Sequence, residues 1–150
     1  MPELLLSDIT VMGAGYCVIG LDRLSADSYH SVRPMPPWGF AWREPFRLMR
    51  GDYVRVRWRE APARPPHIED RPSFGLSATG RTLSEKDLID CLRKSEMGSD
   101  LDSLFGCRVQ MSSRGGRALW VNPREAKRSI CGCGYENLRF RLYPESAGFS

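Results

Sequence analysis

Seven residues in the middle of the chain, Tyr53 to Arg59, alternate strictly in character. Val54, Val56 and Trp58 fall on one side of an extended chain, and this period of two is typical of a half-buried strand. The opposite side carries an arginine ladder, which consists of Arg55, Arg57 and Arg59. The rise of a strand spaces these arginines by about 6.6 Å, close to the distance between phosphates in an extended nucleic-acid strand. We therefore predict a strand with one face in a core and the other facing a polyanion.

Arginine dominates the basic residues of the whole chain, because Lys86, Lys94 and Lys127 are the only lysines among 22 basic residues. Arginine binds phosphate through two nitrogens and stacks on bases, which suits a nucleic-acid partner. A GC-rich genome would also raise the arginine content, so composition alone does not establish such a partner. A second alternating stretch near the end of the chain carries Arg139 and Arg141, which we include among the candidate nucleic-acid contacts.

The stretch from Met35 to Pro45 is rich in proline and aromatic residues, and we predict a loop because consecutive prolines interrupt a regular strand ladder. Trp38 and Trp42 accompany Arg43 there. Exposed aromatic rings beside arginines are what single-stranded nucleic-acid sites use to stack bases. The same rings could instead plug the open end of a small barrel. Both interpretations stay open at this point.

Fourteen glycines and 11 prolines divide the chain into short segments, which predicts a mainly β protein with one or two short helices. A helix should begin after a cap at Thr82 or Ser84, with Leu88, Ile89 and Leu92 buried. We expect strands over residues 4–12, 16–21 and 29–33, the last stopped by Pro34. We also expect a helical turn over residues 101–105 and a hairpin between residues 107–111 and 118–121.

Four short stretches in the first 70 residues resemble, in their order and spacing, the dual OB-containing domain family of prokaryotic proteins. They are Asp8–Gly13, Gly15–Asp22, Val32–Pro34 and Pro66–Asp70. The resemblance implies two small OB-like β-barrels packed together and a nucleic-acid or nucleotide ligand. Several members of this family have predicted roles in conflict or defence. No binding residues are carried over from the family to this chain.

We predict that residues 1–70 form an N-terminal OB-like half. Residues 71–82 show no periodicity, so we predict a linker there. Residues 83–150 are predicted to form a C-terminal half with a helix and a partial barrel. Because this half is short, one barrel plus an incomplete second barrel is the alternative to two barrels.

The loop after the ladder holds the densest cluster of titratable groups, His67, Glu69 and Asp70, directly after two prolines. Such a cluster could ligate a divalent metal or supply an acid and a base for phosphoester cleavage. It could instead lock the loop, with the carboxylates accepting hydrogen bonds from backbone N–H groups. Arg33, fixed ahead of Pro34, could bind a phosphate or form an internal ion pair with Glu69 or Asp70. We favour the loop lock and predict no metal site.

The five cysteines are expected to be reduced thiols in a cytoplasmic protein. Cys131 and Cys133 form a two-thiol turn, but structural zinc takes four ligands and the other cysteines are irregularly spaced. No stretch approaches the roughly 20 apolar residues that span a bilayer, and Met1 to Leu6 lacks the features of a secretory signal. We therefore expect a cytoplasmic location, no cofactor and no membrane contact.

These features predict a non-catalytic accessory module that binds nucleic acid, either RNA or single-stranded DNA. One alternative is an adaptor in a larger protein complex, where the arginines meet an acidic partner. A further alternative is a metal-dependent phosphoesterase built on the cluster in the loop. The sequence contains no glycine-rich phosphate loop or nucleophile motif, so we do not predict an enzyme.

Overall fold

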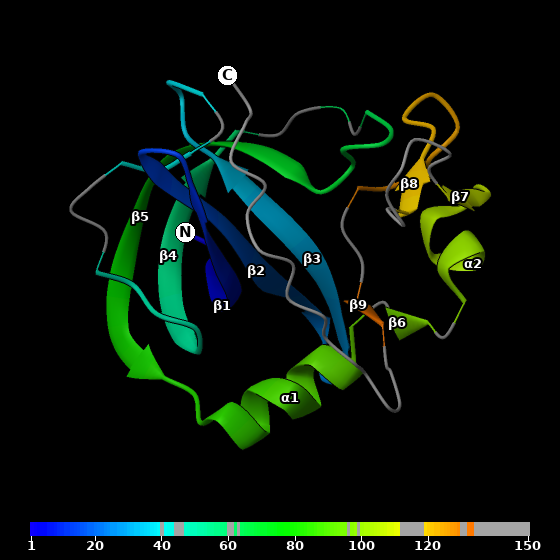
Figure 1. Cartoon of the computed structure of the whole chain (residues 1–150). Helices are drawn as coiled ribbons and strands as arrows, with labels where there is room; N and C mark the ends of the chain where they lie inside the picture. The colour runs from blue at the N-terminus through cyan, green and yellow to red at the C-terminus, as the bar shows by residue number, and fades with distance from the viewer. Residues whose placement is uncertain are drawn as a thin grey trace, which may run out of the picture.

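The structure is a computed structural model that describes residues 1–39, 41–43, 47–59, 62, 64–95, 97–98, 100–111, 119–129 and 132–133. Within these residues the chain is mainly β, as predicted, with two short helices (Figure 1). The first five strands are β1 (Glu3–Met12), β2 (Gly15–Ser25), β3 (Ser28–Met35), β4 (Asp52–Trp58) and β5 (Asp70–Thr82). The later elements are α1 (Glu85–Arg93), β6 (Met97–Gly98), α2 (Leu101–Phe105), β7 (Val109–Met111), β8 (Leu119–Val121) and β9 (Gly132–Cys133).

Strands β1 to β5 close into a barrel in the order β1-β2-β3-β5-β4, in which β4 pairs back to β1. Each neighbouring pair in this barrel is antiparallel except β3 and β5, which run parallel. A small five-stranded barrel of this kind is OB-like. The prediction of an OB-like barrel is therefore confirmed, but the barrel extends through β5 to Thr82.

The barrel interior is filled by side chains that alternate along the strands. On β4, Val54 and Val56 are fully buried, whereas Arg55 and Arg57, which alternate with them, are exposed. The two predicted faces of this strand are thus confirmed. The other buried members of the interior cluster are Leu4, Leu6, Val18, Val32 and Trp42.

Helix α1 lies across the lower end of the barrel in Figure 1. Its Leu88 is buried against Leu5 and Leu21, which point away from the barrel interior. Of the two predicted caps, Ser84 is the one that caps the helix, because its side chain accepts a hydrogen bond from a backbone N–H of the first turn. Ile89 was predicted to be buried but is exposed. The reason is that successive helical residues are rotated by about 100°, and Leu88 already faces the barrel.

The segment predicted to be a linker, residues 71–82, is instead part of the long strand β5. This strand pairs with β3 at its start and with β4 along most of its length, so it closes the barrel. The sequence of β5 shows no clear alternation, because its outer positions opposite the arginines of β4 hold small residues such as Gly75 and Ser77. Such residues do not contrast in character with those at the inner positions. Two register shifts against β4 interrupt the period further.

The predicted end of the third strand at Pro34 is also wrong, because β3 continues to Met35. Here β3 leaves β2 and pairs in parallel with β5. Arg33 donates its backbone N–H to the Glu69 carbonyl at 2.9 Å. Pro34 alternates with Arg33, so the N–H that it lacks would point away from β5 and its ring does not interrupt this pairing.

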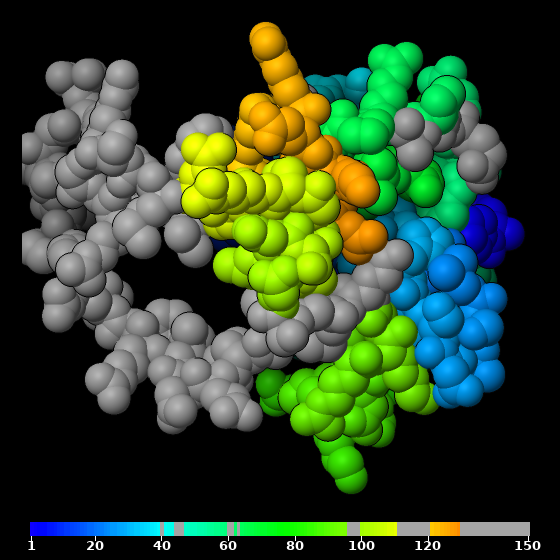
Figure 2. Space-filling model, turned by 90° about the vertical axis from the view of Figure 1, so that its right-hand side faces the viewer, coloured from blue at the N-terminus to red at the C-terminus, as the bar shows by residue number. Residues whose placement is uncertain are grey.

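The second half packs beside the barrel and contains α2 and two small sheets, β6–β9 and β7–β8. Figure 2 shows the α2 segment (yellow) against residues 119–129 (orange), and the Lys127 N–H donates to the Phe105 carbonyl at 2.8 Å. The predicted helical turn and hairpin of this half are confirmed. A second barrel is not shown within the described residues, and the predicted strand with Arg139 and Arg141 lies outside them. Neither α1 nor α2 has the length and apolar character needed to cross a bilayer.

Candidate nucleic-acid interface

The arginine ladder projects from the outer face of β4. Arg55 and Arg57 point outward because the intervening valines point into the barrel, and Arg59 follows the end of the strand. Arg59 is held against β5, since its backbone N–H donates to the Pro72 carbonyl at 2.9 Å. In Figure 1, β4 and β5 form the side of the barrel opposite α2 and β6 to β9. Helix α2 and strands β6 to β9 therefore do not cover the ladder.

Positive charge exceeds negative charge around the ladder. Glu3 of β1 lies 3.7 Å from Arg55 and 2.9 Å from Arg81, and both arginine side chains are more than half exposed. Arg81 also lies over the Tyr53 ring, 4.2 Å from its centroid. Among the residues that the structure describes, the Arg57 side chain forms no hydrogen bond or ion pair. Arg57 is therefore the ladder residue best placed to take an external anion.

A shallow groove of about 220 Å³ runs along the ladder, between β4 and the outer face of β5. Phe74 lines it with half of its surface exposed, and the guanidinium of Arg59 lies 5.7 Å from the centroid of its ring. Gly75 also lines the groove. Sequence reasoning missed Phe74 and Gly75 because their segment was predicted to be a linker. The available signal was a single aromatic residue beside a glycine in a polar stretch.

Trp42 has no free face for a nucleic-acid base. Its indole is 6 % exposed, packs in the barrel interior, and donates from Nε1 to the Pro34 carbonyl at 2.9 Å. Its backbone exchanges two hydrogen bonds of 2.8 Å with Tyr16. Trp42 is thus removed from the candidate contacts, and the alternative interpretation, that this ring plugs the barrel, is confirmed.

Trp38 and Arg43, in contrast, lie on the surface. Trp38 is 52 % exposed, and its ring meets Trp42 edge-on with centroids 5.9 Å apart. The Arg43 guanidinium lies 5.9 Å from the centroid of the Trp38 ring. This exposed cation–aromatic pair stays a predicted contact for nucleic acid, separate from the groove beside the ladder.

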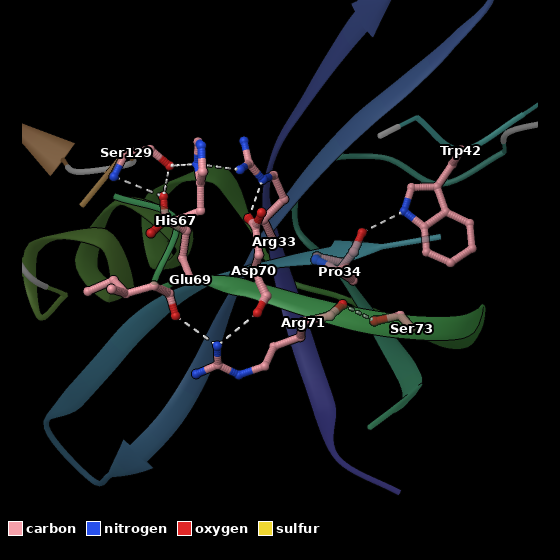
Figure 3. A network of polar contacts seen from close by, with 10 residues as sticks. Arg33, Pro34, Trp42, His67, Glu69, Asp70, Arg71, Ser73 and Ser129 are labelled. Atoms are coloured by element: carbon pink, nitrogen blue, oxygen red, sulfur yellow. Dashed lines mark hydrogen bonds and ion pairs between the residues drawn. The ribbon is translucent and has the colours of Figure 1, made fainter. Parts of the chain in front are cut away.

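Arg33 forms an internal ion pair, which is one of the two alternatives that the sequence left open. Its Nε lies 2.6 Å from Asp70 Oδ1, because the parallel pairing of β3 with β5 sets these residues side by side (Figure 3). Its Nη2 lies 3.2 Å from His67 Nδ1. Burial acts to lower the pKa of Arg33, but the hydrogen bond and charge of Asp70 outweigh this effect and the pKa is raised. The Arg33 guanidinium is thus occupied by contacts within the protein.

Glu69 and Ser129 extend this network to the second half. Ser129 donates its backbone N–H at 3.1 Å and its hydroxyl to Glu69 Oε1 (Figure 3). The same hydroxyl lies 2.9 Å from His67 Nδ1. Glu69 is 4 % exposed, so these bonds hold residues 119–129 against the barrel. Sequence reasoning missed Ser129, because no local pattern links it to a loop 60 residues earlier.

The network has the geometry of a structural lock. In a Ser-His-Asp triad the imidazole lies between the nucleophile and the carboxylate, whereas here the Ser129 hydroxyl lies between His67 and Glu69. His67 Nδ1 faces both the Arg33 guanidinium and the Ser129 hydroxyl. Within the described residues, no group of three or more His, Cys, Asp or Glu side chains is arranged to hold a metal ion. The contacts therefore support the predicted loop lock.

We expect Asp70→Asn to destabilise the fold, because it removes the charged partner of Arg33. The two side chains are 24 % and 19 % exposed. Hydrogen bonds to charged groups contribute about 1.5–3 kcal/mol, and the free energy of unfolding should fall by about that amount in urea denaturation. The matched control is Asp27→Asn, which breaks the exposed pair with Lys94 and should cost about 1 kcal/mol or less. Equal reductions in the free energy of unfolding of the two variants would contradict a structural role for the Arg33–Asp70 pair.

Three of the five cysteines have described side chains. Cys17, Cys91 and Cys107 are free thiols. Burial raises the pKa of the Cys17 thiol despite the nearby Arg33, which acts to lower it, so this thiol stays protonated at neutral pH. Cys131 lies outside the described residues, and the side chain of Cys133 is not described either.

Comparisons of the chain with protein-family models, curated proteins and solved structures gave no significant match. The resemblance to the dual OB-containing domain family thus stays a prediction.

Proposed function

We propose that the protein is a non-catalytic module that binds nucleic acid on the outer face of β4. The observation that carries this proposal is the arginine ladder itself, in which Arg55 and Arg57 project from the outer face of β4 and Arg59 follows the end of that strand. A guanidinium donates two parallel hydrogen bonds to a phosphate, and arginines on one strand face recur at about 6.6 Å. The ladder thus offers successive phosphates of an extended strand one cation each.

The loop network supports this proposal over the phosphoesterase alternative. The groups that would serve as acid, base or metal ligand are His67, Glu69 and Asp70. Each of them is engaged in a contact that holds the fold together. Incubation of the protein with a labelled oligonucleotide and magnesium or manganese should leave the oligonucleotide intact. Cleavage that disappears in a stably folded Asp70→Asn variant would overturn the non-catalytic assignment.

A protein–protein adaptor is the second candidate function, and exposed apolar residues favour it. Val11 and Met12 at the tip of the β1–β2 hairpin are 70 % and 47 % exposed. Such residues at a hairpin tip suit a protein partner, and the ladder would then meet an acidic surface. Copurifying nucleic acid, seen as excess absorbance at 260 nm, would favour the first function. An acidic partner protein that binds in its absence would favour the second.

A change at Glu3 provides a test in which binding should become stronger. Glu3→Gln removes the carboxylate that pairs with Arg55 and Arg81, so both guanidinium groups become available to phosphates. Exposed ion pairs are worth about 1 kcal/mol or less, and we expect up to about fivefold tighter binding of a fluorescein-labelled oligothymidylate in a salt titration. The affinity should also depend more steeply on salt, since more phosphate contacts form.

The matched control for this test is Glu85→Gln, which removes one exposed carboxylate at the start of α1, on a different part of the molecule. It changes the net charge of the protein by the same amount. Equal increases in affinity in both variants would show that net charge, and not the outer face of β4, governs binding. Unchanged affinity of Glu3→Gln would remove Arg55 and Arg81 from the interface.

A further inference from the structure

A β-bulge directs Phe74 to the outer face of the barrel. Arg57 pairs with Gly75 and Trp58 pairs with Ser73, so β5 has one extra residue between these two pairs. Ser73 is 1 % exposed and Trp58 packs against the interior cluster, so both point inward. The extra residue is Phe74, which is 51 % exposed. Without the bulge, a large apolar residue at this point of the strand would face the core, and bulges commonly re-aim a side chain near functional sites.

Gly75 leaves open space beside this ring. A Cβ added at Gly75 would meet no heavy atom within 4 Å, and its φ lies outside the left-handed region that favours glycine. Neither crowding nor backbone conformation therefore requires glycine here, and glycine is otherwise unfavourable within a strand. The missing side chain keeps the groove open between Phe74 and Arg57.

The chain itself covers part of the face that OB barrels commonly use for oligonucleotides, which is formed by β2 and β3. Leu21 of β2 is buried under Leu88 of α1. The Tyr29 N–H of β3 donates to the Lys94 carbonyl at 3.3 Å, and Arg33 is tied to Asp70. The β4–β5 side lies away from α2 and β6 to β9 (Figure 1). An open aromatic ring and arginines with exposed side chains coincide on that side.

We propose that the groove seats one unpaired base of a single-stranded nucleic acid, stacked on Phe74 above Gly75, while the flanking phosphates contact Arg55 and Arg57. The inference deepens the proposed function and rests on it, because the phosphate contacts are those of the ladder. Arg59 does not line the groove, and its guanidinium contacts the Phe74 ring from outside it. The Arg59 guanidinium thus contacts one part of the Phe74 ring, while another part borders the open groove.

Stacking on Phe74 selects single strands over duplexes. In a duplex both faces of each internal base are stacked on neighbouring base pairs, so no face is free for a protein ring. In single-stranded sites, aromatic rings stack on bases of any sequence because every base has a π-face. The groove should therefore discriminate strongly by strandedness and weakly by sequence.

The test compares two ligands that share a backbone. Binding of a fluorescein-labelled oligothymidylate and of an abasic oligomer of equal length is measured by anisotropy at fixed salt. Phe74→Leu and Gly75→Val should each weaken oligothymidylate binding by about 5- to 150-fold, the range for removal of one stacked base. Both variants should lose less affinity for the abasic oligomer, which has no base to stack on Phe74. Phe74→Trp, which keeps an aromatic face, should retain binding of oligothymidylate.

Each outcome separates the base site from the ladder. If Phe74→Leu binds oligothymidylate like the wild type while Arg57→Ala weakens both ligands, the base site is overturned and the proposed function stands. If the wild type binds both ligands equally well, the base site is likewise overturned. A wild type that binds neither ligand would overturn both proposals.

Trp38→Leu tests Trp38 as the alternative residue for base stacking. Weaker binding of oligothymidylate in that variant alone would assign base stacking to Trp38. Melting temperatures near the wild-type value would show that the Phe74 and Gly75 variants are folded.

Discussion

Simultaneous replacement of Arg55, Arg57 and Arg59 by alanine should weaken binding of single-stranded nucleic acid by about 10- to 100-fold at low salt. The physical reason is that each exposed charge pair contributes up to about 1 kcal/mol, and under the proposed function the variant loses the charge pairs between the ladder and the phosphates. The logarithmic dependence of affinity on salt should also flatten, by about 0.7 for each phosphate of the single strand that the variant no longer neutralises. A salt titration of fluorescence anisotropy measures both quantities on one preparation.

The ladder variant should fold normally. Its altered side chains lie outside the barrel, and the buried face of β4, formed by Val54 and Val56, is unchanged. The matched control replaces three other exposed arginines, Arg23, Arg93 and Arg124, with alanine, which changes the net charge equally. An equal weakening of binding in the two triple variants would show that binding is not localised to the ladder. An unchanged slope in the ladder variant would remove β4 from the interface.

The sequence predicts β4 well and β5 poorly, because the inner and outer residues of the two strands differ in how strongly they contrast. On β4, arginine contrasts with valine at each step, so the two faces are visible in the sequence. On β5, Gly75 and Ser77 lie on the outer face opposite arginines, where their small size gives no contrast with the inner positions. The bulge at Phe74 then shifts the period by one residue. A strand of this kind can be recognised only from its partners in the sheet.

The loop network shows a second limit of sequence-based prediction. The pairing of Arg33 with Asp70 was one of two open alternatives, and the parallel register of β3 with β5 decides between them. That register depends on closure of the whole barrel, which no local pattern encodes. Ser129 could not be predicted, since an isolated serine carries no signal for a partner as distant as Glu69. Local periodicity therefore identified the arginines of the candidate site, while long-range pairing determined that Arg33 is tied to Asp70.

Trp42→Ala should produce the largest decrease in stability among the variants considered, because the indole fills the barrel interior. Truncation of a buried Phe or Trp to alanine costs about 3–5 kcal/mol, and Trp42 is 6 % exposed. The change also leaves the Pro34 carbonyl without the indole N–H that donates to it at 2.9 Å. Urea denaturation followed by circular dichroism should show the fall in the free energy of unfolding. Tryptophan fluorescence is less suitable, since the mutation removes a reporter.

Trp38→Ala is the matched control, because the two rings are in contact but Trp38 is 52 % exposed. Its free energy of unfolding should fall by about 1 kcal/mol or less, as expected for a surface substitution. The loss in the free energy of unfolding for Trp42→Phe should lie between those of the two alanine variants, since it keeps an aromatic ring in the core and removes the hydrogen bond to Pro34.

If Trp42→Ala matched Trp38→Ala in stability but bound nucleic acid more weakly, the indole would belong to the interface. A fall in stability with the affinity of the folded protein retained would place Trp42 in the core alone and leave base stacking to rings on the surface.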